Sequence, residues 1–256
     1  MNVDDFNHAP HACALADLPQ RLHWPGGAPS ASARSLADWR MEDDDAPIFS
    51  YLYRQFQPRR HLEFGTWQGF GASLCLDACA ATVWTINLPE GESKPDGSWA
   101  YSEKFAPDEP VPSVTQTQVF GSKETGPVVY HRTDAQGFIG RLYRARGLGH
   151  RVCQIYCDSR NWDTTAYPPG FFDSALVDGG HAPEVVISDT RKALQVLRPG
   201  GLILWHDFCP VPEIRTGFES VRGVTSGLET LLPELSPQMQ TLLWIKPSWI
   251  LLGLKQ

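Results

Sequence analysis

The sequence predicts a doubly wound α/β domain, in which helices cover both faces of a mostly parallel sheet. Strand-like apolar runs alternate with helix-like patterns from residue 58 onward, which is the order expected of a parallel sheet. A glycine-rich turn follows the first of these runs, and two later runs each end in an acidic residue. A chain of 256 residues is long enough for one such domain with a substantial additional segment.

The composition is that of a globular protein outside the membrane, with 42% hydrophobic and 20% charged residues. A formal net charge of -7 argues against nucleic acid as the main partner, because phosphate recognition needs clustered Lys and Arg. The chain has neither an apolar run long enough to span a membrane nor a signal-peptide pattern at its N-terminus. We therefore expect a cytoplasmic protein, with no indication of its oligomeric state.

The N-terminal residues 1–46 are irregular in pattern and contain the acidic run Glu42–Asp45. They are interpreted as an extension, with a short helix around Ser35–Arg40. The main domain is predicted over residues 47–256 and begins with a helix at Ile48–Gln57, where apolar and aromatic residues recur at helical spacing. Pro58 ends this helix.

The first half of the predicted sheet contains two strands and a long insertion. The strand His61–Phe64 leads through a glycine-rich turn into a helix that reaches about Ala80, and Val83–Asn87 forms the next strand. Residues 91–136 are rich in Pro, Gly, Ser and charged residues and show little periodicity. This length is unusual for a passive loop, so the segment is interpreted as a lid over a site, with a disordered surface insertion as the alternative.

The second half completes the sheet and ends in an antiparallel hairpin. In order, the predicted elements are a helix at Phe138–Arg146, strands at Val152–Cys157 and Phe172–Val177, a helix at Glu184–Leu197, a strand at Leu202–Trp205 and the hairpin strands Thr241–Ile245 and Trp249–Leu254. The sequence Pro199-Gly200-Gly201 is expected to end the second helix, because glycine supplies the positive φ that a helix terminus often needs.

The segment Glu63–Gly71 is the first with chemical content. It reads Glu-Phe-Gly-Thr-Trp-Gln-Gly-Phe-Gly and lies between a predicted strand and a predicted helix. Doubly wound sheets bind ligands at this kind of position, since glycines permit close approach and a helix N-terminus offers free N–H groups. The glycine spacing differs from the G-x-G-x-x-G of dinucleotide-binding proteins.

The second informative segment joins two strands through one helix. The first strand ends in Asp178-Gly179-Gly180-His181, and the second ends in His206-Asp207. The carboxyl ends of neighbouring parallel strands meet at one edge of a sheet, beside the glycine-rich turn. Two aspartates and two histidines at such an edge indicate a reactive centre.

Together with Cys157-Asp158-Ser159 at the end of the middle strand, these segments resemble the class I S-adenosylmethionine-dependent methyltransferases. Within that superfamily the pattern is most similar to small-molecule methyltransferases that have an Asp-Gly-x-His turn. The resemblance covers roughly residues 48–210 and is strongest over the last two strands. It implies a seven-stranded Rossmann-like sheet, S-adenosylmethionine as cofactor and a small-molecule acceptor.

The resemblance also implies a set of cofactor contacts. Carried over residue by residue, the cofactor-binding set is Glu63, Gly65, Thr66, Gly69, Asn87, Asp158, Ser159, Trp162 and Asp178. The glycine-rich turn would surround the methionine end, Asp158 and Ser159 would meet the adenine edge, and Trp162 would stack on the base. Asn87 departs from the family pattern, which places a carboxylate there for the ribose hydroxyls.

A metal ion is a further implication of the resemblance. Relatives of the catechol type bind magnesium through acids that end the last two strands, and Asp178 and Asp207 match two of those positions. Phe208 occupies the third position and cannot coordinate a hard cation, which needs oxygen ligands. Binding through water or His206 stays open as an alternative.

Methyl transfer to a hydroxyl group needs alignment, exclusion of water and a base whose pKa lies near the working pH. His181 is the first candidate for this base and His206 the second, with Asp178 beside them in the predicted catalytic set. For both histidines a structural, hydrogen-bonded role is the alternative. The sequence thus predicts an enzyme that methylates oxygen on a small molecule.

Three other functions are weighed. A protein that binds S-adenosylmethionine without turnover is one alternative, because Asn87 and Phe208 both depart from the pattern. An NAD(P)-dependent oxidoreductase shares the fold class, but the glycine spacing and the lack of a Tyr-x-x-x-Lys pair argue against it. A hydrolase of this fold class would need a G-x-S-x-G turn, which the sequence lacks.

Overall fold

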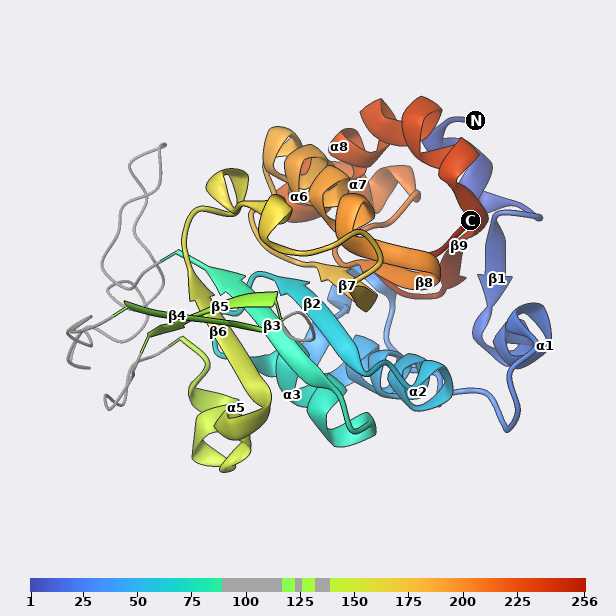
Figure 1. The fold of residues 1–256 in the computed structure, drawn as a ribbon. Coiled ribbons are helices and arrows are strands. Elements are labelled where there is room, and N and C mark those ends of the chain that lie inside the picture. The colour runs from blue at the N-terminus through green and yellow to red at the C-terminus, as the bar shows by residue number, and fades with distance from the viewer. Residues whose placement is uncertain (89–116, 123–125, 132–138) are drawn as a thin grey trace.

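The computed structural model describes residues 1–88, 117–122, 126–131 and 139–256. Its main sheet runs in the order β1-β9-β10-β8-β7-β2-β3-β6 (Figure 1). The strands are β1 Ala12–Ala14, β2 Arg60–Phe64, β3 Thr82–Asn87, β6 Val152–Tyr156, β7 Phe172–Val177, β8 Leu197–Trp205, β9 Met239–Lys246 and β10 Leu251–Lys255. Strands β8, β7, β2, β3 and β6 are parallel, whereas β10 pairs antiparallel with β8 and β9. The predicted doubly wound sheet with a C-terminal hairpin is confirmed.

Helices cover the two faces of this sheet in separate groups. They are α1 Leu18–Leu22, α2 Ala46–Phe56, α3 Phe70–Ala78, α5 Arg141–Ala145, α6 Pro183–Val196, α7 Pro212–Gly217 and α8 Glu219–Leu235. Figure 1 shows α2, α3 and α5 on one face, and α6 with α8 on the other. Within the described residues, no helix is long and apolar enough to cross a membrane.

The sheet has one strand more than predicted. Strand β1 comes from the N-terminal segment and pairs in parallel with β9, where Ala12 lies opposite Trp244. Three residues are too few to produce a strand pattern in the sequence, which explains why β1 was not predicted. The segment around it is packed against the domain, since Val3, Phe6 and Leu18 are fully buried.

One other prediction needs correction, and two helices were missed. Helix α6 ends at Val196, and β8 begins at the next residue, so Pro199-Gly200-Gly201 lies within the strand as an irregularity in its pairing with β7. A proline followed by two glycines is common after a helix, but the same residues also occur where a strand is irregular. The sequence therefore did not distinguish a helix end from a bulged strand at this point. Helices α7 and α8 were not predicted.

The long insertion predicted over residues 91–136 is described only in part. Strands β4 Thr117–Ser122 and β5 Gly126–His131 form a separate antiparallel pair. The interpretation of the segment as a lid lies outside the described residues.

The centre of the sheet contains a polar link to α2. His61 is fully buried on β2, with its Nε2 3.3 Å from the Tyr53 hydroxyl and its Nδ1 2.7 Å from the Ser174 hydroxyl. Burial lowers the pKa of His61 to about 3, so this histidine is neutral. It joins α2, β2 and β7 beneath the edge where the site lies.

Candidate active site

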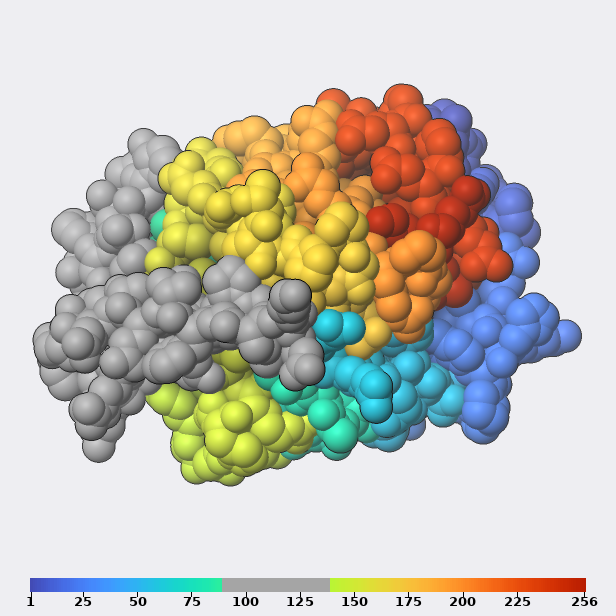
Figure 2. Space-filling model, in the orientation of Figure 1, coloured from blue at the N-terminus to red at the C-terminus, as the bar shows by residue number. Residues whose placement is uncertain are grey.

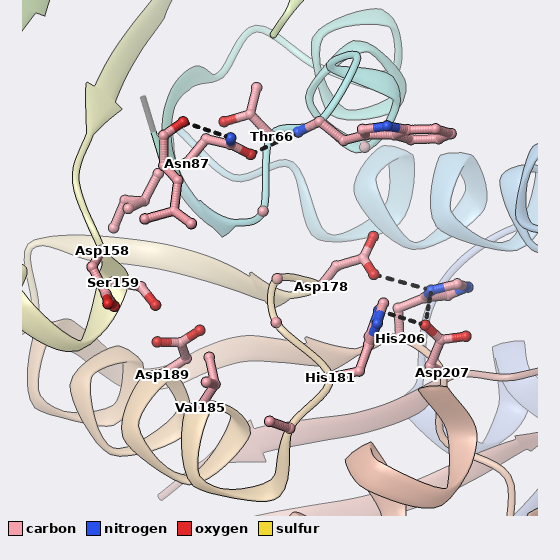
Figure 3. Close-up of a pocket in the computed structure, with 18 of the residues that line it drawn as sticks. Thr66, Asn87, Asp158, Ser159, Asp178, His181, Val185, Asp189, His206 and Asp207 are labelled. Atoms are coloured by element: carbon pink, nitrogen blue, oxygen red, sulfur yellow. Dashed lines mark hydrogen bonds and ion pairs between the residues drawn. The ribbon is translucent and has the colours of Figure 1, made fainter. Parts of the chain in front are cut away.

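A cavity of about 670 Å³ lies at the carboxyl ends of β2, β3, β6, β7 and β8 (Figure 3). Because these strands are parallel, the residues that follow them converge on one edge of the sheet. The space-filling view in Figure 2 gives the outer surface of the molecule in the same orientation as Figure 1. The volume is in the usual range for small-molecule sites, so the edge can hold a ligand of cofactor size.

The glycine-rich turn after β2 forms one wall of the cavity. Gly65 has a φ of +96°, and a Cβ at this position would overlap the carbonyl oxygen of Asp178. Only glycine therefore allows the turn to lie directly against the end of β7. The cavity is lined by Gly65 and Thr66 of this turn, by Gly71 at the start of α3 and by Asp178 at the end of the neighbouring strand β7.

Asn87, the residue expected at the ribose, holds this turn in place. Its Oδ1 accepts a hydrogen bond of 3.0 Å from the backbone N–H of Trp67, and its Nδ2 donates to the Leu88 carbonyl at 2.9 Å. Asn87 also lines the cavity. An amide can make both bonds, whereas a carboxylate at this position cannot donate to a carbonyl.

Glu63 and Gly69 do not line the cavity, although both were predicted to contact the cofactor. Glu63 is buried beneath the turn and accepts a hydrogen bond of 2.5 Å from the Thr85 hydroxyl, which lies 2.7 Å from the Thr66 hydroxyl. Burial raises the pKa of Glu63 to about 8, so the carboxyl group is protonated near neutral pH. Its observed contacts support the turn from below.

Asp158 and Ser159 line the cavity after β6, as predicted for the adenine edge. Asp158 is already engaged, because its carboxylate accepts hydrogen bonds from the backbone N–H and the guanidinium of Arg160 at 2.5 to 3.1 Å. Trp162 is not among the lining residues. Its ring packs edge-on against Phe64 and tilted against Tyr167, in the core behind the site.

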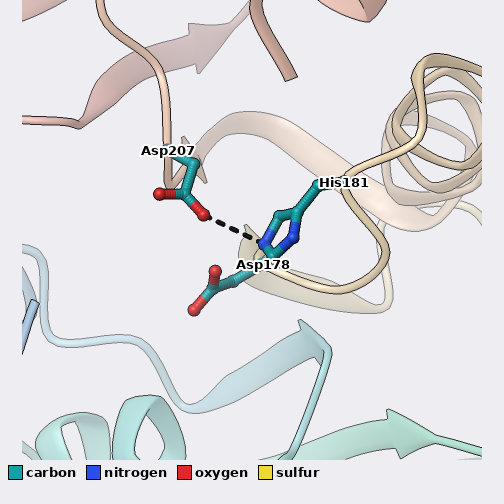
Figure 4. Close-up of side chains that lie close together, drawn as sticks. All are labelled: Asp178, His181 and Asp207. Carbon is teal, nitrogen blue, oxygen red and sulfur yellow. Dashed lines mark ion pairs between the residues drawn. The ribbon is translucent and has the colours of Figure 1, made fainter. Parts of the chain in front are cut away.

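A cluster of two histidines and three aspartates occupies the other end of the cavity. His206 lies between Asp178 and Asp45, with its Nδ1 3.1 Å from Asp178 Oδ1 and its Nε2 3.1 Å from Asp45 Oδ2. His181 Nε2 forms an ion pair with Asp207 Oδ2 at 2.9 Å (Figure 4). All but Asp45 line the cavity.

The surroundings of His206 define its charge. The side chain is only 5% exposed, and both ring nitrogens face a carboxylate. Burial alone would lower its pKa, but Asp178, Asp207 and Asp45 outweigh burial and raise the pKa well above its ordinary value. A buried imidazolium with both nitrogens engaged has no lone pair for an acceptor proton, so this geometry favours a structural and electrostatic role.

His181 has a different environment. Its side chain is 37% exposed and stands at the cavity, where Asp207 contacts only one ring nitrogen. Burial opposes the charged form, but Asp207 and Asp178 outweigh it and raise the pKa of His181. A histidine oriented by an aspartate, with its second nitrogen unoccupied by any described residue, matches the arrangement of a general base.

Sequence reasoning missed the contribution of the N-terminal segment. Met41 and Glu42 line the cavity, and Asp45 is fully buried against His206 while its Oδ1 lies 3.4 Å from the backbone N–H of Trp249. The acidic run was visible in the sequence, but nothing local connected it with a histidine far along the chain. The only local signal for this contact was that Asp45 directly precedes the apolar helix α2.

The donor atoms at the predicted metal site are of mixed type. Asp178, His181 and Asp207 each offer a ligand atom, and these atoms all lie within 4.8 Å of one another. One donor is an imidazole nitrogen, whereas magnesium prefers an octahedron of oxygens, and Phe208 is fully buried. The described residues thus fit magnesium poorly, and coordination by Asp178 and Asp207 stays a prediction.

Comparison with known proteins assigns the class of enzyme. A family model described as a methyltransferase domain matches residues 62–208, and the chain belongs to this family. It is an S-adenosylmethionine-dependent methyltransferase of class I fold, as the sequence predicted. No match was found among curated proteins.

Solved structures with the same fold are distant in sequence. A proposed caffeoyl-CoA O-methyltransferase from Staphylococcus aureus is 12% identical, with a TM-score of 0.50 over 94% of this chain and 90% of the other. The O-methyltransferase TomG from Streptomyces achromogenes, in complex with S-adenosylmethionine, is 16% identical, with a TM-score of 0.48 over 94% and 87%. The methyltransferase PaMTH1 from Podospora anserina is 16% identical, with a TM-score of 0.49 over 83% and 78%.

Proposed function

We propose that this enzyme transfers the methyl group of S-adenosylmethionine to a hydroxyl oxygen of a small molecule, with His181 as general base. The observation that carries the proposal is the position of the His181–Asp207 pair, which opens into the same cavity as the glycine-rich turn. His181 accepts the proton, and the glycine-rich turn lets the backbone lie close to the cofactor. The hydroxyl group that receives the methyl group would lie between His181 and the turn.

The two ends of the cavity are lined by different kinds of residue, and we base the proposed orientation of the cofactor on this difference. Figure 3 shows Asp158 and Ser159 at one end and the His181 and His206 cluster at the other, with Asn87 and Thr66 along one side. The adenosyl group fits the first end, where it meets residues that follow β6. The methionine portion then lies along Gly65–Gly71, with the reactive methyl group facing His181.

The chemistry needs little from the protein beyond position and charge. When bound, S-adenosylmethionine supplies an activated methyl group on a sulfonium centre. Asp207 orients the imidazole of His181 through Nε2, so Nδ1 is the nitrogen that accepts the hydroxyl proton. The imidazolium of His206 balances the charge of Asp178 beside the reaction. No step is assigned to a metal ion.

The His181→Ala variant tests this function. We expect S-adenosylhomocysteine to bind with wild-type affinity in calorimetry, while methyl transfer to a panel of phenolic and sugar hydroxyls falls by roughly 10²- to 10⁴-fold. His150→Ala is the matched control, because His150 is exposed and lies outside the cavity. Transfer by His181→Ala at the wild-type rate would contradict the assignment of the base.

A further inference from the structure

Asp189 lies in the wall of the cavity, and its carboxyl group accepts no hydrogen bond of good geometry from the part of the chain that the structure describes. It belongs to α6, its side chain is only 1% exposed, and it is one of the lining residues. Figure 3 shows its carboxylate beside Ser159, at the end of the cavity away from His181. It also lies close under the turn after β7, since a Cβ at Gly179 would be 3.5 Å from Asp189 Oδ2.

Among the described residues, no group donates a hydrogen bond of good geometry to either carboxylate oxygen of Asp189. Burial raises the pKa of Asp189 to about 7 and outweighs the nearby Ser159 hydroxyl and the positive charge of Lys192, which lower this pKa. A buried carboxyl group without a donor destabilises a folded protein, so native structures rarely keep one unless a ligand completes it.

The neighbouring residues show that α6 is built to support this end of the cavity. Lys192, one turn after Asp189, donates hydrogen bonds to the carbonyls of Ser159, Arg160 and Trp162 at 2.7 to 2.8 Å. The helix thus holds the loop after β6 with one side chain and presents Asp189 beside it. Both oxygens of Asp158, in contrast, already accept hydrogen bonds from Arg160.

We propose that Asp189, rather than Asp158, accepts the hydrogen bond of the exocyclic amino group of the adenine ring, and that it thereby selects an adenine nucleoside. The inference rests on the proposed function, in which the cavity binds the cofactor with its adenosyl group at this end. A base without that amino group leaves Asp189 buried and unpaired, which is the strongest form of discrimination available to a polar site. A carbonyl oxygen of the carboxyl group accepts the bond in either protonation state.

The test compares S-adenosylhomocysteine with the same thioether built on purine riboside, which lacks the 6-amino group. Calorimetry on the full-length protein measures both dissociation constants. We expect the wild type to prefer the adenine compound by roughly 10- to 100-fold. The near-isosteric Asp189→Leu variant should bind both compounds with equal, weaker affinity, whereas Asp189→Asn keeps the preference because its amide oxygen still accepts the bond.

Asp158→Ala separates the two candidate acceptors, because it removes the other carboxylate at this end of the cavity. Whatever its effect on affinity, this variant should keep the preference for the adenine compound. The inference is overturned if Asp189→Leu still prefers the adenine compound, if Asp158→Ala loses the preference, or if the wild type binds both compounds equally. Failure of the wild type to bind S-adenosylhomocysteine at all would instead remove the proposed function. A urea midpoint for Asp189→Leu at or above the wild-type value shows that the variant is folded.

Discussion

Three histidines of this chain have different roles, and their neighbours determine which role each has. His61 is enclosed by the hydroxyl groups of Tyr53 and Ser174 and is neutral, because no carboxylate compensates its burial. His206 is equally buried but faces aspartates on both sides, so it carries a charge. Of these three, His181 alone contacts an aspartate through one ring nitrogen and leaves the other nitrogen unoccupied by any described residue at the cavity. The residue type alone does not reveal these differences.

The buried carboxyl group of Glu63 makes stability depend on pH. Its folded-state pKa of about 8 lies above that of an unfolded glutamate, so the folded protein loses stability as pH rises between those two values. We expect the wild type to lose a few kcal/mol of unfolding free energy from pH 5 to pH 9 through this group, because each pH unit between the two pKa values corresponds to about 1.4 kcal/mol. Urea denaturation across this range measures the loss.

The Glu63→Gln variant isolates this effect, because glutamine keeps the size of the side chain and cannot ionise. Its stability should fall less steeply with pH than that of the wild type, with the two curves closest at pH 5. Parallel curves would show that Glu63 does not carry a raised pKa. Other acids contribute equally to both curves, so the difference reports on Glu63 alone.

Site residues that directly follow a strand could be predicted from the sequence. Site residues contributed by distant parts of the chain could not. Asp178, His181 and Asp207 were predicted from the ends of β7 and β8, and they do gather at one cavity. Asp45 was missed because its partner His206 lies in a distant part of the chain. The sequence could not show that Trp162 packs into the core. Trp162 lies in an irregular loop, where no periodic pattern indicates whether a side chain points inward or outward.

The turn after β2 and the end of β7 fit together as a pair of elements. Because a Cβ at Gly65 would overlap the Asp178 carbonyl, we expect Gly65→Ala to force the two elements apart. The variant should lose about 3 kcal/mol of unfolding free energy, combining backbone strain with the clash. S-adenosylhomocysteine binding should weaken at least tenfold, because the cavity wall moves. Urea denaturation and calorimetry measure these effects.

Gly147→Ala is the control for backbone strain alone. Gly147 also has a positive φ, +70°, but no atom lies within 4 Å of the position of a Cβ. The cost should be about 1 kcal/mol, with unchanged ligand affinity. Equal losses in the two variants would mean that the contact between the elements contributes nothing.

The elements that the sequence predicted well are those with strong local patterns. Strands β2, β3, β6 and β7 were predicted to within one residue at each end, because their apolar runs are bounded by turn residues. The start of β8 was missed because an irregular strand with proline and glycine resembles a helix terminus. Helix α8 has a clear apolar face, but two glycines and a proline within it obscure the pattern.

At the scale of the whole molecule, the N-terminal segment adds strand β1 to the sheet and packs against the rest of the chain. Deleting residues 1–16 would remove the buried side chains of Val3, Phe6 and Leu15 and expose the edge of β9. We expect a loss of about 6 kcal/mol, from roughly 2 kcal/mol for each of these three side chains. The exposed edge should also promote association between copies. Urea denaturation and size-exclusion chromatography measure the two effects, and a variant with the stability and the elution volume of the wild type would contradict this view.

The pairing of β1 with β9 has a consequence for how the protein is made. During synthesis Ala12 leaves the ribosome 232 residues before its neighbour Trp244. Asp45 likewise waits for His206 and Trp249. Contacts between distant parts of a chain form slowly, so the outer edge of the sheet and the His206 end of the cavity should form only after β9 and Trp249 have emerged. Nascent chains that stop before Met239 would then hold an unfinished sheet and an incomplete pocket.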